Sequence, residues 1–142
     1  MNQLRIIIMS TAIMLSVAAF SQNEIDRVVD QFSTIGSSTF TSAVERDPHT
    51  RRVIKTVKVL ETSYGPNVSK LKNAFEKEAN TGNFSTKKED NETKMILTVQ
   101  TERTNRIYML NFTSHHNIYS GGKATIIVKV RQKQENEKND KL

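Results

Sequence analysis

The histidines are the side chains of this sequence best suited to metal binding or proton transfer. There are three of them: His49 in a proline turn, and the adjacent pair His115-His116. Adjacent residues of an extended chain point to opposite sides, so we do not expect His115 and His116 to hold one metal ion together. No HExxH or EF-hand spacing and no second ligand cluster accompanies them. We therefore predict exposed loop histidines, with no metal site and no other cofactor.

Nucleophilic and carboxylate chemistry also lacks its usual sequence patterns. The chain has no cysteine, no GxSxG elbow and no Ser-x-x-Lys. Asp26 and Asp30 stand four residues apart on a predicted helix, but Arg27 lies beside them, which is typical of a solvated polar face. Gly121-Gly122-Lys123 precedes a predicted strand, whereas a phosphate-binding loop needs a following helix, so we interpret it as a hairpin turn. We predict no catalytic residue.

The distribution of basic residues is the sequence feature that says most about possible binding partners. The 142-residue chain has 21 Lys and Arg against 15 Asp and Glu, a formal net charge of +6. Six of them are assigned to one outer face of the predicted sheet: Lys94, Arg106, Lys123, Lys129, Arg131 and Lys133. Such a face can bind an envelope protein or an anionic glycan or lipopolysaccharide. The alternative is that basic residues on an edge strand prevent aggregation. Nucleic acid is not a predicted partner, because the sequence has no nucleic-acid motif.

The first 22 residues have the anatomy of a secretory signal peptide. Arg5 is followed by an apolar stretch from Ile6 to Phe20 and then by Ser21 and Gln22. As a helix, this stretch would span about 22 Å of a hydrocarbon core about 30 Å thick, which favours a cleaved signal peptide over the alternative of an uncleaved membrane anchor. Small residues precede a cleavage site between Ser21 and Gln22, and no cysteine follows that could carry a lipid. We predict an exported protein, periplasmic or extracellular, without a lipid anchor or a transmembrane span after cleavage.

Apolar spacing in the mature chain predicts the elements that must position any site. Helices are expected over residues 23–35 and from Gly65 to Gly82. Strands are expected from Ser38 and over 52–61, 84–88, 94–103, 106–114 and 123–133. The order α-β-β-α-β-β-β-β predicts an α+β domain over 22–133 in which two helices pack on one face of a mainly antiparallel sheet. A disordered polar tail is predicted over 134–142.

Four segments carry a resemblance to known proteins. They are AFSQ at 19–22, EIDRVVDQFSTIG at 24–36, RRVIKTVKVLE at 51–61 and TKMILTVQTERTNRIYMLNF at 93–112. With these segments the chain resembles the small exported proteins of unknown function found in Bacteroides and its relatives. The resemblance covers nearly the whole chain and implies a fold and a compartment. It implies no functional residue, because that family has no established activity.

A signal peptide and a complete core without a catalytic or metal pattern predict a non-enzymatic binding or accessory module of the bacterial cell envelope. One alternative is an inhibitor of an exported hydrolase, although the Gln-x-Val-x-Gly loop of cystatins is absent. Another is a small enzyme whose site only the fold assembles. That alternative requires a deep pocket in which Asp or Glu lies beside His49, His115 or His116.

Overall fold

Two helices and six strands follow each other in the predicted order in the computed structural model, which describes residues 22–131. The helices are α2 (Glu24–Ser33) and α3 (Gly65–Glu78), and a short 3-10 helix, η1 (Ala79–Thr81), follows α3. The strands are β1 (Ser38–Arg46), β2 (Val53–Thr62), β3 (Asn83–Glu89), β4 (Glu92–Gln100), β5 (Thr104–His115) and β6 (Ile118–Val130). This confirms the α+β fold class. The predicted signal peptide and the predicted tail lie outside the described residues.

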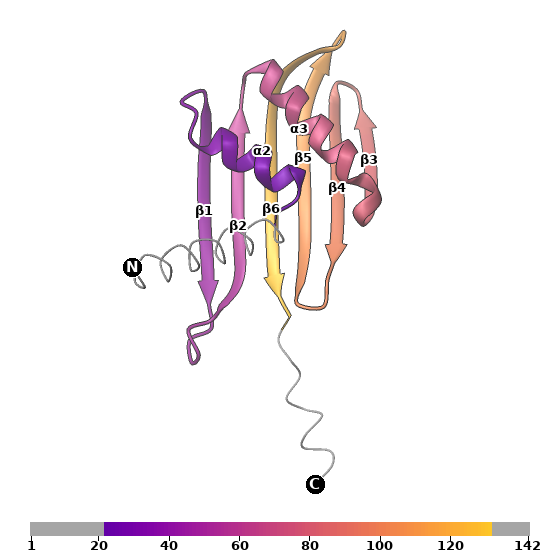
Figure 1. Cartoon of the computed structure of the whole chain (residues 1–142). Helices are drawn as coiled ribbons and strands as arrows, with labels where there is room; N and C mark the ends of the chain where they lie inside the picture. The colour runs from indigo at the N-terminus through magenta and orange to yellow at the C-terminus, as the bar shows by residue number, and fades with distance from the viewer. Residues whose placement is uncertain (1–21, 132–142) are drawn as a thin grey trace, which may run out of the picture.

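All six strands pair antiparallel in one sheet with the order β1-β2-β6-β5-β4-β3. Both helices lie on the same face of this sheet (Figure 1). The last strand, β6, therefore lies in the middle of the sheet, between β2 and β5. The interpretation that basic residues on this strand protect an edge is wrong, because the edges are β1 and β3.

Helix α2 begins with a capping box. The Asn23 side chain accepts a hydrogen bond from the backbone N–H of Asp26, and the Asp26 carboxylate accepts one from the backbone N–H of Asn23. Ile25, Val29 and Phe32 then recur on the buried face of the helix. The helix ends at Ser33, two residues earlier than predicted.

The turn between β5 and β6 lies at His116 and Asn117, and not at Gly121-Gly122 as predicted. His116 and Asn117 both have positive φ, 50° and 66°, as a two-residue hairpin of the primed type requires. Asparagine and histidine tolerate this region better than most other residues that carry a side chain. Gly122 lies inside β6, where a Cβ would approach a Val68 methyl group of α3 to 3.0 Å. The glycine therefore serves the close packing of helix on strand.

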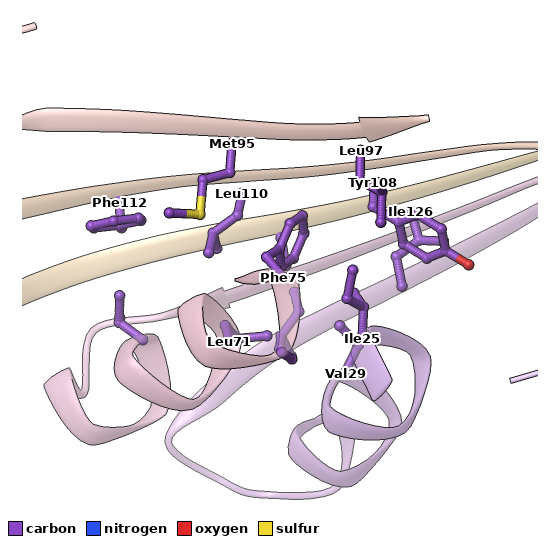
Figure 2. Packing of buried hydrophobic residues seen from close by; sticks show 14 of the residues in the cluster. Ile25, Val29, Leu71, Phe75, Met95, Leu97, Tyr108, Leu110, Phe112 and Ile126 are labelled. Atoms are coloured by element: carbon purple, nitrogen blue, oxygen red, sulfur yellow. The ribbon is translucent and has the colours of Figure 1, made fainter. Parts of the chain in front are cut away.

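The core lies between the two helices and the sheet face beneath them. Figure 2 shows side chains of both helices directed at alternate residues of the central strands. Ile25 and Val29 come from α2, and Leu71 and Phe75 come from α3; all four are completely buried. Against them lie Met95, Leu97, Tyr108, Leu110, Phe112 and Ile126. Buried and less buried side chains alternate along these strands, which leaves every second side chain on the other face of the sheet.

The start of α3 is held against β6 at Gly65. A Cβ on Gly65 would lie 2.7 Å from the backbone oxygen of Tyr119, closer than such atoms can approach. We expect Gly65→Ala to lower the free energy of unfolding by about 1–3 kcal/mol, because the helix must move off the strand. Gly36→Ala is the control, since a Cβ there meets nothing within 4 Å. Urea denaturation measures both, and equal stability of the two variants would contradict the proposed contact.

Candidate functional site

The sheet face opposite the helices, called here the open face, is covered by no element of the described chain. Its centre carries large apolar side chains instead of the polar residues usual on a solvated sheet face. These side chains come from the four central strands in two adjacent cross-strand rows. We call them the apolar band: Val57, Val59, Ile96, Ile107, Met109 and Ile127. All six are partly exposed.

Polar rows bound the apolar band at both ends of the strands. In each row, each residue is the cross-strand partner of the next. The Glu61 row consists of Glu61, Lys123, Asn111, Lys94 and Lys87. The Glu45 row consists of Glu45, Lys55, Lys129, Asn105 and Gln100. The open face is thus apolar at its centre and mixed in charge along both margins.

A hollow of about 860 Å³, called here the end hollow, lies at the Glu61 row. All five residues of that row line it, together with Glu89 and Glu92. Within it, Lys123 Nζ lies 3.7 Å from Glu61 Oε1, and Lys87 Nζ lies 3.1 Å from Glu89 Oε1. Glutamates therefore balance most of the positive charge. The end hollow is a polar, charge-mixed depression and not a basic patch.

The structure brings part of the predicted basic face together. Lys94, Lys123 and Lys129 lie on the open face, and Arg131 follows β6 on the same side, where its Nε donates a hydrogen bond to Asn105 Oδ1 at 3.0 Å. The role of this face in binding stays a prediction.

The remaining predicted site residues lie at or beyond the ends of the described range. Lys133 lies outside the described residues. The predicted cleavage site is only half described, since Ser21 also lies outside and Gln22 is exposed at the start.

Arg106 does not belong to the outer surface to which it was assigned. It lies on the helix-covered face, where its Nη1 is 3.6 Å from Asp26 Oδ2. The reason is register: Arg106 has the same parity in β5 as the buried Tyr108 and Leu110, so it points under α2. The assignment of Arg106 to the basic outer face is wrong.

A buried polar cluster of Asp26, Arg106 and Tyr108 escaped the sequence analysis. The Tyr108 hydroxyl donates a hydrogen bond to Asp26 Oδ2 at 3.1 Å, and the Tyr108 side chain is completely buried. Burial raises the pKa of the Asp26 carboxyl above its ordinary value of 3.8, against the opposing effects of the Asn23 and Tyr108 hydrogen bonds and the Arg106 charge. Burial and the Asp26 charge raise the pKa of Tyr108 to about 12.

The two helix carboxylates interpreted as a solvated pair thus have different environments. Asp26 is buried, and the prediction of a solvated face is wrong for it. Asp30 is partly exposed and lies 3.3 Å from Lys58 Nζ. The only sequence signal for the difference was the position of Asp26 three residues after Asn23, which is that of a capping box.

The histidines lie in turns. His49 follows Asp47 in the β1–β2 turn, where its backbone N–H donates to Asp47 Oδ1, and His115 and His116 lie at the β5–β6 turn. None of them lines the end hollow. Among residues 22–131, no three His, Cys, Asp or Glu side chains are grouped so that they could hold a metal ion.

Within the described range, none of the helices is long and apolar enough to cross a membrane. No protein-family model matches the sequence, and no curated protein matches it either. The resemblance to small exported proteins of Bacteroides therefore stays a prediction.

The buried cluster predicts an unusual pH dependence. Because the folded state holds the Asp26 proton more tightly than the unfolded state, this group stabilises the fold below pH 3.8 and loses that contribution as pH rises through the raised pKa. We expect Asp26→Asn to gain stability relative to the wild type as pH rises through this window. Urea denaturation of both proteins between about pH 3 and pH 7, which covers the pKa values usual for carboxyl groups, measures the difference in their free energies of unfolding.

Asp30→Asn is the control, because its partly exposed ion pair contributes at most about 1 kcal/mol. A relative stability of Asp26→Asn that falls with rising pH would show that the Arg106 charge outweighs the burial of the carboxylate.

Proposed function

We propose that this protein is an exported, non-enzymatic binding module of the bacterial envelope that engages a protein partner through its open face. The observation that supports this proposal is the apolar band, which lies at the centre of a sheet face left bare by the described chain. An apolar patch with a polar rim is typical of an interaction site.

The size and shape of the band favour a macromolecule over a small ligand. Two rows on four adjacent strands project over roughly 270 Å², and the polar rows extend this surface on both sides. A small-molecule site is instead a concave pocket that encloses most of its ligand. The end hollow is concave, but it is wide and charge-mixed.

The charges of the open face favour a protein over a polyanion. An acidic glycan or lipopolysaccharide would require a field of one sign, whereas Glu61 and Glu89 lie beside two of the lysines of the end hollow. Mixed charges around an apolar centre are typical of protein interfaces, in which the rim sets orientation and the centre supplies affinity.

Export is the first testable part of this proposal. We expect the protein recovered from outside the cytoplasm to begin at Gln22, because the small residues Ala19 and Ser21 fit a signal-peptidase site. Intact-mass measurement of the purified protein gives the N-terminus. Ala19→Arg is the control that should block cleavage. A recovered chain that retains residues 1–21 would contradict the predicted processing.

The binding surface is tested by photocrosslinking in the native envelope. A photoreactive residue at Thr125, at the centre of the open face, should form an adduct with a protein partner. The same residue at Asn73, exposed on the outer side of α3, should not. Mass spectrometry identifies the adducts. Equal adduct formation from both positions, or none from Thr125, would exclude the open face as the binding surface.

A further inference from the structure

Resting on the proposed function, we infer that the partner of the open face is a second copy of this chain, related to the first by a two-fold axis that runs parallel to the strands, midway between β6 and β5. In this arrangement two open faces meet as the two sheets of a sandwich, about 10 Å apart. Homo-oligomers most often have such a two-fold interface, in which one surface must be complementary to itself. The open face meets this condition in its strand order, its apolar residues and its charges.

The strand order places equal numbers of strands on both sides of the axis. With the order β1-β2-β6-β5-β4-β3, the axis brings β6 over β5 of the second copy, β2 over β4 and β1 over β3. A two-fold rotation about an axis parallel to the strands reverses the order of the strands in the second copy, but it leaves each residue at the same height along the strand direction. Each cross-strand row therefore faces the same row of the second copy.

The apolar band is complementary to itself under this rotation. Ile127 faces Ile107 of the second copy, and Val59 faces Ile96 of the second copy. Met109 faces Thr125 of the second copy, because Met109 and Thr125 belong to the same cross-strand row. Every large apolar side chain of the band is thus placed over an apolar side chain or a threonine. No charged side chain is placed over the band.

The charges in the two polar rows also become complementary. In the Glu61 row, Glu61 on β2 faces Lys94 on β4 of the second copy, and the symmetry repeats the pair. In the Glu45 row, Lys55 faces Gln100 and Lys129 faces Asn105, so no two lysines oppose each other. The aligned packing of twisted sheets rotates the strands by about 30°, and long lysine and glutamate side chains span the resulting offset.

The other face-to-face two-fold axis, perpendicular to the strands, is disfavoured by charge. It would place each strand over its own copy and exchange the two polar rows. Lys55 would then face Glu61 of the second copy, but Lys129 would face Lys123, whereas the axis parallel to the strands opposes no two lysines. Like charges across an interface cost several kcal/mol, and this cost suppresses the wrong orientation.

The available area is sufficient for a stable dimer. With about 4.8 Å between strands and about 3.4 Å per residue, the sheet from the Glu45 row to the Glu61 row covers at most roughly 29 by 24 Å, or about 700 Å² per copy, since β3 ends one row short of the Glu45 row. A standard interface buries about 800 Å² per partner. The two end hollows lie at the same end of the dimer, where water screens the Glu61–Lys94 pairs. These pairs set the orientation of the two copies, and replacing one partner by a like charge also weakens the dimer.

The test uses the purified exported protein and its oligomeric state by sedimentation equilibrium. We expect a dimer at micromolar concentration in the wild type, and a monomer for Met109→Lys, which places a charge in the middle of the band. Val44→Lys is the matched control, because Val44 is 53% exposed and has the parity of Phe40 in β1, which places it on the helix-covered side and not on the open face. Circular dichroism and the Tm show that each variant is folded.

A charge exchange tests the orientation of the two copies. Lys94→Glu should raise the dimer Kd at least about tenfold, because it places a carboxylate against that of Glu61 of the second copy. Within one copy the change opposes no carboxylate directly, since the cross-strand partners of Lys94 are Lys87 and Asn111. The double variant Glu61→Lys/Lys94→Glu should restore dimerisation. A double variant as weak as Lys94→Glu alone would overturn the two-fold axis.

The remaining outcomes separate this inference from the proposed function. A dimer that Met109→Lys leaves intact would overturn the inference, because the contact would lie elsewhere. A wild-type monomer at about 100 μM, well above the range of a stable interface, would also overturn it. In that case a Thr125 adduct with a different protein would leave the proposed function standing. The absence of any Thr125 adduct would remove the proposed function as well.

Discussion

The alternation of side chains along the β-strands is the constraint on which this structure depends. Both helices cover the same face of the sheet, and their side chains, such as Phe75 and Ile25, pack on the strand residues that point to that face. This packing fixes which alternate residues of each strand are buried and which point to the other face. Tyr108 and Leu110 lie in the core, and Ile107 and Met109 must then point the other way. The packing of both helices on one face of the sheet thus creates both the core and the open face.

The buried cluster ties the first helix to this arrangement. The Asp26 carboxylate accepts a hydrogen bond from the start of its own helix and another from Tyr108 of the central sheet. Local helix capping and tertiary packing therefore share one side chain. Its burial is unfavourable for the charged form, and Arg106 beneath the helix offsets part of that cost. The cluster explains how a basic residue is accommodated on the covered face, where packing alone would favour an apolar one.

The open face differs from the usual solvated side of an antiparallel sheet, because its apolar residues are concentrated at the centre and its charges lie at the margins. A uniformly basic face would attract any polyanion, whereas mixed margins would discriminate between orientations of the proposed partner. The position of β6 at the centre of the sheet is essential here. It brings residues of the last strand next to those of β2, which lie far away in the sequence, and so makes the apolar band continuous.

Periodicity in the sequence was enough to determine the helices, most strand positions and the α+β class, because these depend on the burial of local apolar repeats. It correctly placed Lys94 and Lys123 on one face. Only the tertiary structure decided that β6 is central, that Arg106 lies beneath α2, and that Gly122 serves helix packing while His116 and Asn117 form the turn. Strand order, and the choice of which face the helices cover, arise from contacts between segments far apart in the chain. Local sequence patterns therefore do not predict the strand order or the face that the helices cover, and these two features together produce the open face.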